Sequence, residues 1–154
     1  MKIIVDCELS NKFNELDNFN SLSIINLTGC FPVHKRLDKL GACGSMSGGV
    51  NLNFCRNKFD VPKRIGDTIN YEDNWRKYSV LNVVDNYPKD SIAIIFDCGV
   101  DDFFYEDNKA LHKKLVAMHV KHDYTERPGK HDWKYWSNAV EYQLLFFKRY
   151  FNGY

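Results

Sequence analysis

Three short apolar segments predict the strands of a sheet. The clearest is SIAIIFDCG, residues 91–99, a continuous β-branched run that ends at a glycine. Runs of this kind are typical of a strand buried on both faces of a parallel sheet. Residues 42–48, ACGSMSG, form a candidate strand of small residues. Residues 121–129, KHDYTERPG, form a third candidate that is closed by proline and glycine.

Two longer segments have the spacing of amphipathic helices. Residues 104–119 place three apolar side chains on one face, namely Leu111, Leu115 and Met118. Residues 133–151 carry a longer apolar stripe made of Trp136, Val140, Leu144, Phe147 and Phe151. The order strand, helix, strand, helix predicts an α/β fold with a parallel sheet.

The remaining segments are polar. The whole chain, residues 1–154, is expected to form one domain. Residues 51–88 form a long polar and aromatic region with short helical pieces, of the kind that covers a site. Residues 1–40 are an atypical, asparagine-rich N-terminal segment whose one short apolar run, Leu22 to Leu27, is a candidate strand. A chain of 154 residues with 44% hydrophobic content is long enough for one core.

The charge and the cysteine content of the chain limit the classes of ligand and partner that we expect it to bind. The net charge of +1 comes from 21 basic and 20 acidic residues without blocks, which argues against nucleic acid and membrane surfaces and favours a small neutral ligand. Five cysteines without CxxC spacing indicate free thiols rather than a disulfide framework or a zinc site.

The start of the chain lacks the features of a secretory signal, so a cytoplasmic protein is expected. We expect no cofactor and no metal, and read three histidines as surface residues: His112, His119 and His122.

An acid and a base follow successive predicted strands. Asp101 and Asp102 come after residues 91–99, and His131 comes after residues 121–129. Functional groups in open α/β sheets lie just beyond the carboxyl ends of the strands. An acid followed by a histidine is the second half of the α/β-hydrolase order of serine, acid, histidine. Either aspartate could instead cap the following helix, and a lone histidine is often an ordinary loop residue.

The nucleophile is harder to assign. GACGSMSGG, residues 41–49, looks like a damaged Gly-x-Ser-x-Gly elbow, but neither serine fits. Cys43 stands two residues before Ser45, and Ser45 stands two before Ser47, where the motif has glycine. Both serines are better read as small strand residues under a helix.

Three motifs together resemble a known family. GACGSMSGGVNL, CGVDDFFYEDN and HDYTERPGKHDWKYW resemble the C-terminal part of an esterase family that includes esterase D, tributyrin esterases and feruloyl and acetyl-xylan esterases. The resemblance runs from about Gly41 to the end. It implies the C-terminal portion of an α/β-hydrolase fold, with the N-terminal strands missing, and serine-esterase chemistry on small-molecule esters. It also implies that Asp102 is the triad acid and His131 the base.

The same resemblance places the nucleophile one helix before residues 45–48. Counting back reaches SLSIIN, in which Ser23 takes the nucleophile position, while Ser21, Ile25 and Asn26 stand where the family has glycines. The expected function is a serine carboxylesterase that is weak because elbow glycines and an oxyanion loop are missing, with self-association through an exposed sheet edge. The alternative is a non-catalytic remnant or binding module that retains this half of the fold.

Overall fold

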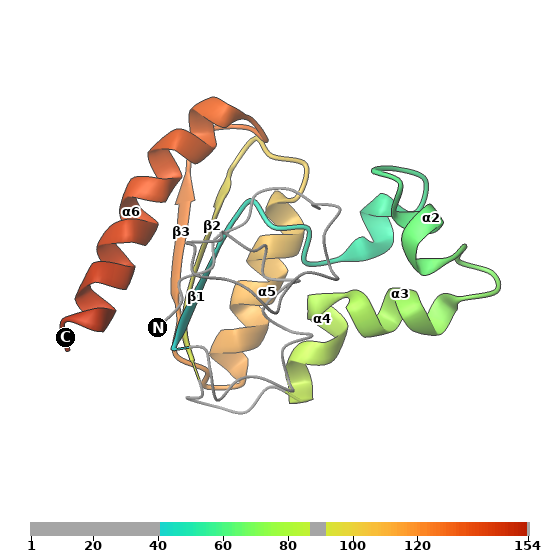
Figure 1. Ribbon diagram of the computed structural model, residues 1–154, viewed down its shortest axis with the longest axis horizontal. Coiled ribbons are helices and arrows are strands. Elements are labelled where there is room, and N and C mark those ends of the chain that lie inside the picture. Colours follow the sequence, from blue (N-terminus) through green and yellow to red (C-terminus); the bar gives the residue numbers. More distant parts are fainter. Residues whose placement is uncertain (1–40, 87–91, 154) are drawn as a thin grey trace, which may run out of the picture.

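The computed structural model describes residues 41–86 and 92–153, and within them three strands form one parallel sheet. The strands are β1 (Ala42–Met46), β2 (Ala93–Gly99) and β3 (Asp123–Arg127), in the spatial order β1-β2-β3. Helix α5 (Tyr105–Ala117) connects β2 to β3, and α6 (Trp133–Phe151) follows β3. The sheet lies between these helices, with α6 on one face and α5 on the other (Figure 1). The predicted parallel α/β arrangement is therefore confirmed.

Alternation along β2 fills both layers of the core. Ile94 and Phe96 pack in one cluster with Leu111 and Leu115 of α5. Ile95, pointing the other way, packs in a second cluster with residues of α6. A strand buried on both faces has no solvent side, so its sequence is apolar throughout rather than alternating.

Short helical segments connect β1 to β2, as predicted for residues 51–88. They are η4 (Leu52–Cys55), α2 (Val61–Ile65), α3 (Glu72–Tyr78), α4 (Val80–Val83) and η5 (Val84–Asn86), and they lie on the α5 side of the sheet (Figure 1). A third apolar cluster joins this region to the end of β2 and the start of α5, through Leu52, Cys55, Val61, Trp75, Cys98 and Phe104.

The bounds predicted for the last helix are correct, but its predicted apolar stripe is partly wrong. Leu144 is 43% exposed, whereas Gln143 is fully buried. Gln143 Nε2 donates hydrogen bonds to the Ser45 carbonyl oxygen and to Asp97 Oδ2. The helix is therefore turned so that a polar side chain faces the sheet, where two buried acceptors require a donor. The full buried set on α6 is Tyr135, Trp136, Ala139, Gln143 and Phe147.

The surface assignment of the histidines is also partly wrong. His112 of α5 and His122 before β3 are both half-buried, and His112 Nδ1 lies 2.8 Å from His122 Nε2. His119 is exposed, as expected. No cluster of three or more metal-binding side chains occurs within the described ranges.

Cys43, Cys55 and Cys98 are buried free thiols, in agreement with the expectation for these three cysteines. Among helices in the described ranges, none has both the length and the apolar character needed to cross a bilayer. The candidate strand Leu22 to Leu27 and the proposed nucleophile Ser23 lie outside the described residues.

Candidate active site

The loops that follow β2 and β3 are bonded to each other beyond the ends of the strands. The Val100 amide donates to the Arg127 carbonyl oxygen at 2.9 Å, and the Asp101 amide donates to the Gly129 carbonyl oxygen at 3.0 Å. The pairing of β2 with β3 ends at Gly99 and Arg127, and these two bonds join the loops just beyond that point. The loop that carries the aspartates is thus held beside the loop that leads to His131.

Asp102 is fixed by hydrogen bonds within the turn between β2 and α5. Its amide donates to the Gly99 carbonyl oxygen at 3.1 Å, which closes a tight turn after β2. Its Oδ1 accepts a hydrogen bond from the Phe104 amide at 2.9 Å, and its side chain is fully buried. Phe104 precedes the first turn of α5, and no side chain caps this helix, so the bond fixes the turn after β2. The capping role considered from the sequence is therefore wrong, and Oδ2 of Asp102 remains available.

The second oxygen of Asp102 contacts His131. The distance between Asp102 Oδ2 and His131 Nδ1 is 2.9 Å, so the hydrogen bond expected for this pair is present. A carboxylate accepts only, so Nδ1 carries the proton and Nε2 of the neutral imidazole is left with a lone pair. Among the described residues, Nε2 has no hydrogen-bond partner. The imidazole can thus accept a proton at Nε2 while Asp102 stabilises the resulting cation.

Aromatic rings surround the imidazole. The ring centroid of His131 lies 4.4 Å from that of Phe103 and 4.9 Å from that of Trp136, with the tryptophan perpendicular to it. Asp132, the next residue, caps α6 by accepting a hydrogen bond from the Tyr135 amide at 2.9 Å. The His131 side chain is 21% exposed, so the imidazole is held by packing yet open to a ligand.

The structure distinguishes the two adjacent aspartates. Asp101 is exposed and uses its backbone amide to bind Gly129, whereas Asp102 is buried against His131. The choice of Asp102 as the partner of His131 is therefore correct. Its role as triad acid, and that of His131 as base, stay predictions.

Neither serine of the GACGSMSGG segment contacts this pair. Ser45 lies within β1 and is fully buried. Ser47 follows β1, is 2% exposed, and its Oγ lies 3.9 Å from the Cys98 sulfur. Its backbone has a φ of 51°, a left-handed conformation that is costly for a serine. A sharp turn therefore does follow β1, but it directs a buried hydroxyl toward a thiol.

Sequence reasoning missed a buried polar cluster on the α6 face of the sheet. Asp97 of β2 is 2% exposed and accepts a hydrogen bond from Gln143, while Arg127 Nη2 lies 3.5 Å from its Oδ1. Burial raises the pKa of Asp97, against the opposing effects of Gln143, Tyr135 and Arg127. An aspartate within an apolar run was the available signal, since a buried carboxylate requires partners.

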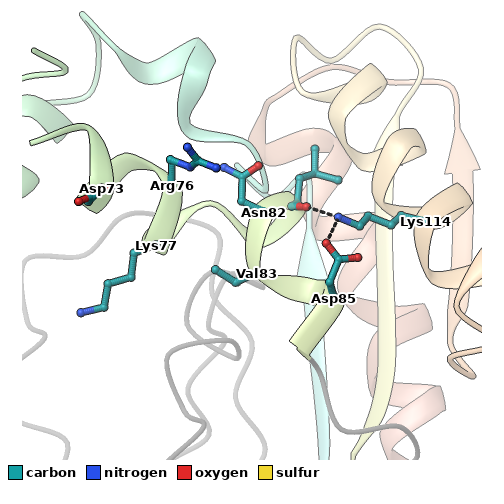
Figure 2. A pocket seen from close by; sticks show the side chains of 8 residues that line it. Asp73, Arg76, Lys77, Asn82, Val83, Asp85 and Lys114 are labelled. Atoms are coloured by element: carbon teal, nitrogen blue, oxygen red, sulfur yellow. Dashed lines mark hydrogen bonds and ion pairs between the residues drawn. The ribbon is translucent and has the colours of Figure 1, made fainter.

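A hollow of about 410 Å³ between the α3–α4 region and α5 is separate from the acid–base pair. Lys114 borders it and donates to the Leu81 carbonyl oxygen and to Asp85 (Figure 2). Neither Asp102 nor His131 lines it. Since Lys114 lies in the last turn of α5, whereas Asp102 precedes the start of this helix, the hollow does not serve the site.

The three-stranded parallel sheet with helices on both faces agrees with part of an α/β-hydrolase fold, and the comparisons with known proteins support this class. No protein-family model and no curated protein matches the chain. Solved structures do. A ferulic acid esterase matches with 27% identity and a TM-score of 0.60, over 80% of this chain and 46% of its own. The S-formylglutathione hydrolase of Staphylococcus aureus matches with 22% identity and a TM-score of 0.59, over 73% and 46% of the two chains.

A substrate-bound fluorophosphonate-binding serine hydrolase F of the same bacterium matches with 19% identity and a TM-score of 0.55, over 73% and 46%. The described part of the chain is thus similar in fold to about half of an esterase of the α/β-hydrolase class. It spans less than half the length of the structures it matches.

Proposed function

We propose that this chain carries the acid and base of an ester hydrolase that works by acyl transfer through a serine. The observation that carries the proposal is the bond of 2.9 Å between Asp102 Oδ2 and His131 Nδ1, which leaves Nε2 available for a proton. The similarity to a ferulic acid esterase, over 80% of this chain, supports the hydrolase class. The substrate is a small-molecule ester.

In the proposed reaction His131 moves protons and Asp102 does not. As the serine oxygen attacks the ester carbonyl carbon, Nε2 accepts the serine proton, and the imidazolium is stabilised by the Asp102 carboxylate. The tetrahedral intermediate then expels the alcohol, whose oxygen receives the proton from Nε2, and an acyl-serine remains. Water, deprotonated by the same nitrogen, attacks the acyl-serine. Nε2 then returns this proton to the departing serine oxygen, which releases the carboxylic acid and restores the serine hydroxyl.

Ser23 is the proposed nucleophile. This assignment comes from its position one helix before residues 45–48 in the family resemblance, and Ser23 lies outside the described residues. The burial of Ser45 and Ser47 supports it indirectly, because a nucleophile must reach both the imidazole and the substrate.

The test is covalent labelling of the full chain with a fluorophosphonate probe, which reacts with activated serines. We expect slow stoichiometric labelling at Ser23, located by peptide mass spectrometry. Asp102→Asn and His131→Ala should each reduce the labelling rate by at least about a hundredfold, since removal of a triad member costs about 10⁴-fold or more in established cases.

Two matched variants serve as controls. Asp101→Asn removes the neighbouring exposed carboxylate, and His119→Asn removes an exposed histidine whose left-handed backbone, with φ of 57°, suits asparagine. Both should label at the rate of the unmodified chain. Labelling that is absent in the folded chain, or that is unaffected by Asp102→Asn and His131→Ala, would show that the acid–base pair does not activate a serine.

A further inference from the structure

Beside the acid–base pair lies a surface of three phenylalanine rings, Phe54, Phe59 and Phe103, which we call the aromatic face. The ring of Phe103 is nearly parallel to that of Phe54, at 5.0 Å and 13°, and to that of Phe59, at 6.2 Å and 21°. Phe59 is 49% exposed and Phe103 is 45% exposed. Large apolar side chains that gather in the open beside a polar site are typical of ligand contacts.

Neighbouring side chains pack against the rings of the aromatic face. Phe104 is 6% exposed and meets Phe103 edge-on at 4.6 Å and Phe54 at 5.4 Å. Lys58 Nζ lies 3.8 Å from the centre of the Phe54 ring, which holds that ring by a cation–π contact. The rings are therefore fixed in place, so a ligand that binds them orders few side chains and loses little entropy.

The position of Phe103 relates this surface to one part of the substrate. Phe103 follows Asp102 in the chain, and its ring centre lies 4.4 Å from that of His131. In the proposed reaction His131 protonates the departing alcohol, so the oxygen of that alcohol must come within hydrogen-bond reach of the imidazole. The carbon skeleton attached to this oxygen then has the Phe103 ring within reach.

We propose that the aromatic face is a subsite for the alcohol portion of the ester and that it selects aromatic alcohols of the benzyl type. This inference rests on the proposed function, because it takes the alcohol to lie beside His131. A flat ring can stack on Phe103 and Phe59 with favourable quadrupole contacts, whereas a saturated ring of equal size gains only the burial of apolar surface. The preference for aromatic over saturated alcohols thus follows from the nearly parallel rings of the aromatic face.

Direct binding tests the subsite without any turnover. The isotopically labelled full chain is titrated with benzyl alcohol and, in parallel, with cyclohexylmethanol, which has the same carbon count without a π-system. We expect saturable NMR shifts at Phe103, Phe59 and the His131 ring, with benzyl alcohol binding about two- to tenfold more tightly than cyclohexylmethanol. Equal affinity for the two alcohols, or shifts confined to other surfaces, would overturn the proposal.

Two variants and one control assign the effect to the aromatic face. Phe103→Leu and Phe59→Leu should each weaken benzyl alcohol binding about two- to tenfold and leave cyclohexylmethanol binding nearly unchanged. Phe59 is half exposed, so its variant remains informative if Phe103→Leu does not fold. Ile69→Ala, at a side chain that is 89% exposed, should bind both alcohols as the unmodified chain does. Unchanged preference in the leucine variants contradicts the inference.

The binding experiment and the labelling experiment distinguish a failure of this inference from a failure of the proposed function. Selective benzyl alcohol binding without fluorophosphonate labelling would support the subsite and reject the active serine. Labelling that depends on His131, without selective alcohol binding, would support the hydrolase and reject the subsite.

Discussion

Gly99, the last residue of β2, packs directly against Gly129 in the loop after β3, and a methyl group on Gly99 would collide with the Gly129 carbonyl oxygen. Asp102 lies three residues after the first glycine, and His131 lies two residues after the second. Because no side chain separates the two backbones, the acid and the base can meet across the loops. The missing side chain of Gly99 therefore allows the approach of the two side chains of the candidate site.

Gly99→Ala is expected to separate the acid from the base. The added methyl group must push the loop of Gly129 away, which costs about 1–3 kcal/mol of unfolding free energy and lengthens the bond between Asp102 and His131. Urea unfolding measures the first effect, and loss of the proton signal of His131 Nδ1 in NMR spectra measures the second. Gly153→Ala adds the same group where nothing lies within 4 Å, and should leave the His131 signal unchanged.

Ser45→Ala and Ser47→Ala should leave ester hydrolysis essentially unchanged. Both hydroxyls are buried, and that of Ser47 faces the Cys98 sulfur rather than His131. The measurement is turnover of a short-chain nitrophenyl ester by each folded variant beside the unmodified chain. Complete loss of activity in a folded alanine variant would make that serine the nucleophile and exclude Ser23.

The contact between His112 and His122 predicts a stability that falls in acid. Burial and the neighbouring charge of His122 lower the pKa of His112 from its usual value of 6.5, against a smaller opposing effect of Glu126. With a lower pKa in the folded state, the unfolded chain binds the proton first as pH falls below about 6.5, so the free energy of unfolding decreases from about pH 7 to pH 5.

His112→Asn should reduce the dependence of the unfolding free energy on pH in this range. Asparagine keeps a donor for His122 Nε2 but does not titrate. Urea unfolding at a series of pH values measures the slope. His119→Asn, at an exposed histidine, should retain the slope of the unmodified chain. An unchanged slope in His112→Asn would assign the acid sensitivity to other groups.

The pattern of the chain predicts the strands, the two long helices and the approach of the aspartates after β2 to His131, since each depends on local periodicity or on the geometry of parallel strand ends. The choice of Asp102 over Asp101 came from the family resemblance. The rotation of α6 was not predictable in this way. It depends on Gly44 of β1, whose missing side chain makes room for Gln143 and for Phe147. That contact joins residues about a hundred positions apart and leaves no periodic signal.

The aromatic face was missed for a related reason. Phe54 and Phe59 lie in a polar region without clear periodicity, and their approach to Phe103 depends on how that region folds back on the end of β2. Phe103 was read only as part of the segment that carries the aspartates. Local sequence thus identifies the groups that perform acid–base chemistry, while tertiary packing decides which apolar side chains stand beside them.

A pair of adjacent substitutions on α6 tests its rotation. Gln143→Leu removes the hydrogen bonds to the Ser45 carbonyl oxygen and to Asp97 Oδ2, and should cost about 1–3 kcal/mol, because the buried Asp97 carboxylate loses its donor. Leu144→Gln places an amide on a side chain that is already 43% exposed and should change the unfolding free energy by less than about 0.5 kcal/mol. Both values come from urea unfolding. The apolar stripe read from the sequence requires the reverse order, with Leu144→Gln the damaging change, so the sign of the difference decides which face of α6 meets the sheet.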